Sequence, residues 1–357
     1  MKVNFKTGFA FALGLVITAC NPQTVQAPVT TAEPAPVISS TPLSIVPLED
    51  RLLASINADE HPLSTPTMIG NHPEEIVFAK GFIWIHLVNG HLVQVDPATN
   101  TIVGAIKVDT TTDIHHYCQG LGTDGENIWT CSASGKDSEE EDNRTIDVVR
   151  VDPQTRSIVE TFKVEKIFDQ LYMPFAQNQI WVLTGDGSKL VGIDVSNNQP
   201  NPTIDLGTRC FHLAALGNIL YASCGLDNLV IKIDPEKKEV LARQTLQNYP
   251  NFISAAKNGL WVSQNNSVTR LDPESLNPIV TITGITPSDI NATEAAVWVW
   301  EYGKGVLYKI DPATNEVVEL IKPGKPFMSG GGVLPTSESI WLTVDENNLL
   351  LRLKLND

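Results

Sequence analysis

The sequence predicts an all-β fold, a seven-bladed β-propeller with four antiparallel strands in each blade. Two markers recur along the chain in phase. The first is an Asp that ends a β-branched run and usually precedes Pro, and the second is an aromatic residue that follows an aliphatic one. Successive copies of the first marker are 42, 40, 38 and 39 residues apart, at Asp152, Asp194, Asp234, Asp272 and Asp311. A period of about 40 residues with short strands between turn residues is typical of propeller blades.

The aromatic marker predicts the number of blades, because it occurs once per unit. Its copies are Trp84, Trp129, Trp181, Tyr221, Trp261, Trp298 and Trp341. We expect these side chains to pack between neighbouring blades. Short strands at this spacing, separated by Gly, Asn and Asp turns, favour four antiparallel strands in each unit.

The Asp-Pro marker is best explained as a tight turn. "DPATN" occurs twice, at 96–100 and 311–315. An Asp side chain accepts hydrogen bonds from backbone amides further along a turn, and Pro presets φ. A ring of calcium-binding carboxylates is the alternative, but it needs the Asp side chains to converge, and the blades spread them around the rim.

The last blade lacks a fourth strand of its own after Trp341. The segment "LLASINAD" at 52–59 resembles "IVGAIKVD" at 102–109, which is the expected fourth strand of the first blade. We therefore expect the N-terminal segment to complete the last blade and close the ring. Closure removes a sheet edge that otherwise invites aggregation.

The N-terminal region predicts export and lipid anchoring. Residues 1–19 have the form of a signal peptide, with two lysines before an apolar run too short to span a bilayer. The end of this run resembles a bacterial lipobox, which implies cleavage before Cys20 and lipid on its sulfur; an ordinary signal peptide is the alternative. Residues 20–48 are rich in Pro and Thr and predict a tether, and residues 49–357 form the propeller. The expected location is the cell envelope, periplasmic or on the cell surface.

The net charge of −16 argues against a nucleic-acid partner, because phosphate binding needs a basic surface. It fits a soluble, self-repelling particle, and we expect a monomer. The membrane, through the lipid anchor, and a small-molecule or protein ligand are the expected partners.

Four further cysteines predict two disulfides within hairpins. The pairs are Cys118 with Cys131 and Cys210 with Cys224, at separations of 13 and 14 residues. Disulfides are typical of exported proteins. A metal site is the alternative, but the close C-x-x-C spacing of such sites is absent.

The "IDPATN" turn and the "IW" strand resemble the YVTN-type and streptogramin-lyase-like (virginiamycin B lyase-like) bacterial propellers, over residues 50–357. The resemblance implies the propeller fold. The lyases use histidine and glutamate with a divalent metal on the later blades. In this chain the last histidine is His212, so no catalytic residue carries over from that family.

Candidate ligand-binding residues lie in the connections between blades, which share one face of the ring. They are His115, His116, Tyr117, Glu74, Tyr172, Arg209, Asp289 and Trp300. A histidine near a carboxylate across the channel would bind a divalent metal or act in acid–base catalysis. Packed or solvated side chains are the alternative for each residue, and inter-blade packing in particular for Trp300. The acidic segment 137–142 is a solvated loop or a cation site.

Two functions follow from this sequence. The first is a membrane-tethered propeller that binds a ligand or a protein as a scaffold, and we favour it because it needs only features that are visible. The second is a metal-assisted lyase or hydrolase with its site over the central channel. No nucleophile elbow, phosphate loop or zinc motif is present. A quinone-dependent dehydrogenase has no support beyond the propeller shape.

Overall fold

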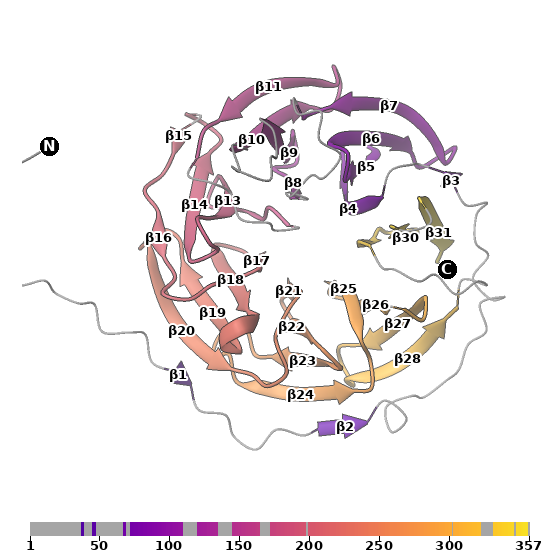
Figure 1. Cartoon of the computed structure of the whole chain (residues 1–357). Coiled ribbons are helices and arrows are strands. Elements are labelled where there is room, and N and C mark those ends of the chain that lie inside the picture. Colours follow the sequence, from indigo (N-terminus) through magenta and orange to yellow (C-terminus); the bar gives the residue numbers. More distant parts are fainter. Residues whose placement is uncertain are drawn as a thin grey trace, which may run out of the picture. The chain divides into compact units, whose positions relative to one another are not determined.

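The structure is a computed structural model in which seven antiparallel sheets form the blades of a ring (Figure 1). All described residues belong to one compact unit, Ala35–Asp357. The described residues are 37–38, 45–47, 67–68, 72–109, 120–134, 145–164, 172–197, 199–301, 303–322, 331–345 and 348–355. None of them forms a helix that is long and apolar enough to cross a membrane.

Blades 1 to 3 come first in the sequence, and in each the first strand lies nearest the channel. Blade 1 contains β4 (Pro73–Ala79), β5 (Phe82–Leu87), β6 (His91–Asp96) and β7 (Thr101–Lys107). Blade 2 contains β8 (Leu121–Thr123), β9 (Ile128–Ser134), β10 (Thr145–Asp152) and β11 (Ser157–Phe162). Blade 3 contains β12 (Phe175–Ala176), β13 (Gln179–Thr184), β14 (Lys189–Asp194), β15 (Gln199–Pro200) and β16 (Ile204–Asp205). In blade 3 the outer position is shared by β15 and β16, which both pair with β14.

Blades 4 to 7 repeat this order. Their strands are β17 (His212–Leu216), β18 (Ile219–Cys224), β19 (Leu229–Asp234) and β20 (Glu239–Thr245); β21 (Ile253–Ala256), β22 (Gly259–Gln264), β23 (Ser267–Leu271) and β24 (Pro278–Thr283); β25 (Pro287–Ala292), β26 (Val297–Glu301), β27 (Val306–Asp311) and β28 (Glu316–Ile321); β29 (Val333–Pro335), β30 (Ser339–Val344), β31 (Leu349–Lys354) and β3 (Thr67–Met68). A 3-10 turn, η3 (Gly225–Asp227), follows β18. The predicted fold class and the seven blades are confirmed.

Burial follows the position of a strand within its blade. The second and third strands, such as β5 and β6, are buried on both faces because neighbouring blades cover them. The outer strands β7 and β11 are mostly exposed. All copies of the aromatic marker are buried, as predicted: Trp84, Trp129, Trp181, Tyr221, Trp261, Trp298 and Trp341.

The Asp-Pro segments form tight turns, as the sequence predicted. The distance from the Asp Oδ1 to the amide nitrogen two residues later is 2.8 Å at Asp96, 2.7 Å at Asp152 and 2.8 Å at Asp311. The last residues of the two "DPATN" copies, Asn100 and Asn315, have φ of 56° and 61°. Asn is tolerated in this left-handed conformation better than most residues, which explains its place at the end of the turn.

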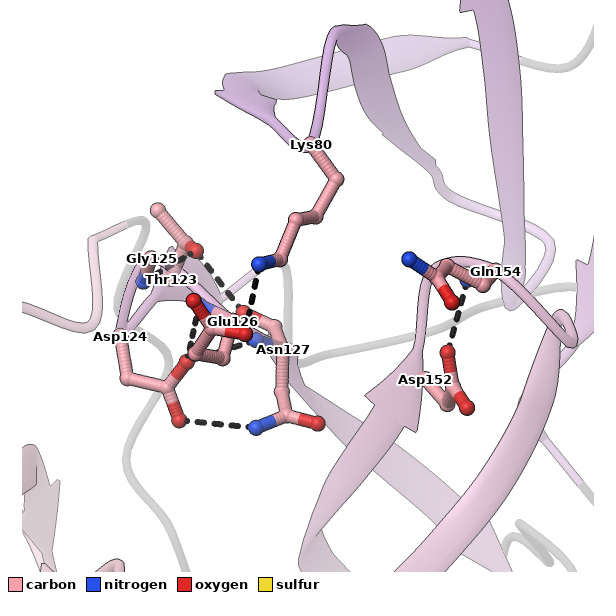
Figure 2. A network of polar contacts seen from close by, with 8 residues as sticks. All are labelled: Lys80, Thr123, Asp124, Gly125, Glu126, Asn127, Asp152 and Gln154. Atoms are coloured by element: carbon pink, nitrogen blue, oxygen red, sulfur yellow. Dashed lines mark hydrogen bonds and ion pairs between the residues drawn. The ribbon is translucent and has the colours of Figure 1, made fainter.

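The turns after the first and third strands of blade 2 each carry an Asp that caps backbone amides, as Figure 2 shows. Asp152 accepts from the amide of Gln154 in the turn after the third strand. Asp124 accepts from the amide of Glu126 in the turn after the first strand, at 2.8 Å. Lys80 of blade 1 reaches this second turn and pairs with Glu126 at 2.5 Å. Asp-centred turns therefore recur on this face of the ring and also connect adjacent blades.

A polar side chain two positions before the turn Asp links each of several blades to the next. Arg270 lies over the ring of Trp261 at 5.5 Å and donates to the carbonyl of Pro312, at 2.6 Å, and to Oδ1 of Asn315, at 2.5 Å. Two other blades make the same crossing, from Gln94 to the carbonyl of Pro153 and from Lys232 to the carbonyl of Glu274. In each case, a side chain of one blade donates to a backbone carbonyl in the Asp turn of the following blade.

The same contact joins blade 7 to blade 1. Arg352 lies over the ring of Trp341 at 4.9 Å and donates to the carbonyl of Pro97 and, at 3.1 Å, to Oδ1 of Asn100. Both identical "DPATN" turns therefore receive an arginine from the preceding blade.

The N-terminal region completes the last blade, with β3 as its fourth strand. In the antiparallel register, Thr67 pairs with Leu350 and Met68 with Leu349. The strand that closes the ring thus lies later in the chain than the segment 52–59 that we expected, and that segment lies outside the described residues.

Two short strands within the predicted tether also pair with the propeller. β1 (Val37–Ile38) pairs in parallel with β20 of blade 4, and β2 (Ile45–Pro47) pairs in parallel with β24 of blade 5. Figure 1 shows both along the outer edge of the ring. These blades therefore have a fifth strand.

One predicted disulfide is present between Cys210, just before β17, and Cys224, at the end of β18. Cys131 in β9 is also disulfide-bonded. Its expected partner, Cys118, lies outside the described residues, as does Cys20, so the second pairing and the lipid anchor stay predictions.

Candidate functional site

Tyr172 of blade 3 is held against the inner strand of blade 2, at the channel. Tyr172 forms a parallel bridge with Leu121, and the amide of Met173 donates to the carbonyl of Leu121 at 3.0 Å. Gly122 allows this approach, because a Cβ at that position would lie 2.1 Å from the carbonyl oxygen of Met173. A glycine inside a strand is a signal of close backbone approach, and here it positions Tyr172.

The hydroxyl of Tyr172 links blade 3 to two carboxyl groups from other blades. It donates to Oδ2 of Asp289 in β25, at 2.9 Å, and it is also hydrogen-bonded to Glu75 in β4. The amide of Val333 in β29 donates to the same Asp289 oxygen at 2.7 Å. These four residues join blades 1, 3, 6 and 7, and we call Glu75, Tyr172 and Asp289 the hub.

Both carboxyl groups of the hub are almost completely buried, with exposed fractions of 2% for Glu75 and 1% for Asp289. Burial raises the pKa of Asp289 to about 7, although hydrogen bonds from Val333 and Tyr172 oppose this shift. Burial, and then the charges of Asp289 and Glu74, raise the pKa of Glu75 well above its usual range. At least one of the two carboxyl groups is therefore protonated near neutral pH.

A cavity of about 290 Å³ lies in the channel next to the hub. Tyr172 is part of its wall, and the rest comes from five more blades. Most of the wall is apolar and small, with Ala214, Ala215, Ala255 and Ala292 among its residues. Several of these residues lie at the far ends of the inner strands, beside the first turn of each blade. The cavity thus lies in the half of the channel nearer the Asp-Pro turns, and we call it the channel cavity.

His212 of β17 is a buried histidine close to the channel cavity, next to the cavity residue Leu213. Its Nε2 is 3.0 Å from Oδ1 of Asn251, and its ring stacks on Phe252 with centroids 4.5 Å apart. Burial lowers the pKa of His212 to about 4. The imidazole is therefore neutral at neutral pH, and sequence reasoning did not select it because a single His carries no spacing signal.

The structure brings two of the predicted site residues together, Tyr172 and Asp289. Glu74 lies beside them in β4 but uses its backbone carbonyl to accept from Thr343 Oγ1, at 2.6 Å. Its neighbour Glu75 is the residue that reaches the hub. Strand alternation decided between these two glutamates, and the sequence alone did not.

Two other predicted site residues lie elsewhere. Arg209 is exposed before β17, over the ring of Phe211 at 5.4 Å, and its charge acts on Asp186. Trp300 is fully buried in the apolar cluster between blades 6 and 7. This burial favours inter-blade packing, the alternative named above, over a stacking platform for a ligand. The remaining candidates lie outside the described residues: His115, His116, Tyr117 and the acidic segment 137–142.

A second cavity, of about 700 Å³, lies between blades 6 and 7 near Trp298, Lys309 and Leu355. Lys309 lies over the ring of Trp298 at 5.3 Å, but it pairs with Glu319 of its own blade, at 3.3 Å. Across the described part of the chain, no cluster of three or more His, Cys, Asp or Glu is arranged to hold a metal ion.

No protein-family model and no curated protein matches the chain. Solved structures do match its fold. The WD40 repeats of RRP9 superpose with a TM-score of 0.66 at 11% identity, covering 83% of this chain and 100% of that one. The β-propeller domain of Cps50 (Swd1) from Myceliophteria thermophila superposes with a TM-score of 0.64 at 13% identity, again covering 83% and 100%.

An enzyme is among the matches as well. A catalytically inactive virginiamycin B lyase from Staphylococcus aureus, in a structure with quinupristin, superposes with a TM-score of 0.64 at 16% identity, covering 83% of this chain and 100% of that one. The chain is a seven-bladed β-propeller. Because identities this low establish the fold alone, the function of the propeller has to be argued from its own residues.

Proposed function

We propose that this propeller is a lipid-anchored, extracytoplasmic binding protein that takes a small ligand into the channel cavity. The cavity is the observation that carries the proposal. It is about 290 Å³, mainly apolar, and bordered by the polar hub residue Tyr172. Ligand sites generally combine an apolar wall with a few placed polar groups that orient the ligand.

Anchoring is a separate part of the proposal and is supported by the sequence around Cys20. Replacement of this residue, Cys20→Ser, is expected to move the protein from the membrane fraction to the soluble fraction and to abolish labelling with a fatty acid. A variant that stays in the membrane fraction overturns the anchor but leaves the cavity argument intact.

The binding proposal is tested with a neutral probe that fits the cavity, benzyl alcohol, by titration calorimetry on the full chain. Ala255→Phe fills the cavity wall and is expected to abolish binding. Ala105→Phe is the matched control, because Ala105 is exposed on the outer strand β7, far from the channel. Binding that is absent in the unmodified chain, or equal in both variants, overturns the proposal.

A metal-assisted lyase is the second candidate, and the hub favours it. Two carboxyl groups with raised pKa values at the channel are the kind of groups that general acid–base catalysis uses. Metal content of the purified chain, compared with His115→Ala and His116→Ala, separates the two candidates. Stoichiometric metal that is lost in either variant supports the enzyme. Metal-free protein that still binds benzyl alcohol supports the binding protein.

A further inference from the structure

The hub contains two buried carboxylate oxygens that accept no hydrogen bond in the described part of the chain. They are Oε2 of Glu75 and Oδ1 of Asp289. A buried carboxylate oxygen without a donor is costly, and such atoms usually mark a ligand, an ion or a water. The two carboxyl groups belong to different blades, and both are hydrogen-bonded to the hydroxyl of Tyr172.

The hydrogen bonds of the hub determine how many protons it holds. The Tyr172 hydroxyl has one proton and donates it to Asp289, which also accepts from the Val333 amide. Its bond with Glu75 is therefore one in which the tyrosine oxygen accepts, and this requires a protonated Glu75. Above a pH of about 7, the ionised Asp289 leaves the hub with one net negative charge.

No positive charge balances the hub from its surroundings in the described residues. The charges that act on Glu75 are those of Asp289 and Glu74, which are both negative. A buried ionised carboxylate is stable only when it is paired. The whole chain carries a net charge of −16, which raises the local concentration of cations near the protein.

We propose that the channel cavity takes a ligand with a primary ammonium group, whose charge is balanced by Asp289. This inference rests on the proposed binding function and adds the chemical class of the ligand. The apolar wall contacts the body of the ligand, and the ammonium group lies at the end of the cavity bordered by Tyr172. The ammonium N–H groups supply the donors that the two unpaired oxygens lack.

Binding transfers a proton but breaks no other bond. The ligand enters as an ammonium ion and pairs with Asp289, which ionises at pH 6 and gives its proton to the buffer, while Glu75 keeps its proton. The source of the ammonium group is a free amine or a lysine side chain of a polypeptide, since both present the same chemistry.

The test compares benzylamine with benzyl alcohol, which has nearly the same size and no charge, by titration calorimetry at pH 6. Benzylamine is expected to bind at least tenfold more tightly than benzyl alcohol and to release protons, measured as a dependence of the binding enthalpy on the ionisation enthalpy of the buffer. Glu75→Gln and Asp289→Asn keep the size of each side chain. Asp289→Asn is expected to remove both the preference for the amine and the proton release, whereas Glu75→Gln, which resembles the protonated carboxyl group, is expected to retain both.

The outcomes separate the two proposals. Benzyl alcohol that does not bind overturns the cavity as a ligand site. Benzyl alcohol that binds as tightly as benzylamine, or a preference for the amine that survives Asp289→Asn, overturns the ammonium site alone. Asp311→Asn, in an Asp-Pro turn, changes the net charge equally and is expected to retain the preference. A third probe, N-acetyl-lysine methylamide, tests the lysine source by the same comparison.

Discussion

Arg352 in the last blade donates a hydrogen bond of 3.1 Å to Oδ1 of Asn100 in the first blade. The same guanidinium also donates to the carbonyl of Pro97. The ring is therefore closed twice, by the backbone pairing of β3 with β31 and by this side-chain contact between the two ends of the repeat. Arg270 and Asn315 make the equivalent contact inside the ring.

Replacing Arg352 by methionine is expected to lower the free energy of unfolding by about 1–3 kcal/mol, because three buried or half-buried acceptors lose a charged donor. The measurement is a urea titration followed by tryptophan fluorescence. Lys107→Met, on the exposed face of β7, is the control and is expected to change stability by less than about 0.5 kcal/mol. Equal stability of the Arg352 variant and the control contradicts a role of this contact in closure.

The pKa of Asp289, raised to about 7, predicts a pH dependence of stability. Between pH 4 and 7 the Asp289 carboxyl group keeps its proton in the native protein and loses it in the unfolded chain. The free energy of unfolding therefore falls as pH rises through this window. Asp289→Asn removes this contribution and is expected to be more stable than the unmodified chain at pH 8, by a margin on the order of a few kcal/mol.

Urea titrations at pH 5 and pH 8 measure this difference. Glu75 shifts in the same direction, so a shallower decline is expected to remain in Asp289→Asn and to disappear when Glu75→Gln is added. A single variant with the same decline as the unmodified chain contradicts the placement of Asp289 in a buried hub.

His212 predicts a pH dependence of the opposite sign. Its pKa is lowered to about 4, so between pH 6.5 and 4 the unfolded chain binds a proton that the native protein does not. Stability is therefore lost as pH falls through this window. His212→Gln keeps a donor for Asn251 and is expected to flatten the profile between pH 6.5 and 4, measured by thermal unfolding. A profile that does not flatten shows that the imidazole is accessible to protons in the native state.

The Cys210–Cys224 disulfide closes a loop with a sequence separation of 14 residues. Replacing both cysteines by alanine is expected to lower the free energy of unfolding by about 3 kcal/mol, mainly because the unfolded chain gains freedom. Denaturant titration measures the change. The single variant Cys210→Ala is expected to be destabilised at least as much, since it also leaves the thiol of Cys224 buried in the core.

The repeat made the architecture predictable. Asp-Pro turns and in-phase aromatic residues depend on local conformation and on apolar burial, which follow from short stretches of sequence. The seven blades, the turn role of Asp96 and Asp311 and the packing of the tryptophans were all predicted for this reason. Pairing of Cys210 with Cys224 was predictable as well, because adjacent strands of a hairpin bring near residues together.

The tertiary structure decided every relationship between residues that are far apart in the chain. The sequence alone did not show that each "DPATN" turn accepts a hydrogen bond from an arginine of the preceding blade. It also did not show that β3 is the strand that pairs with β31. The sequence also did not predict that Glu75, and not Glu74, contacts Tyr172, or that Trp300 is buried. Ring closure places Glu75, Tyr172 and Asp289 around one axis, and only that closure brings two carboxyl groups of separate blades to a single hydroxyl.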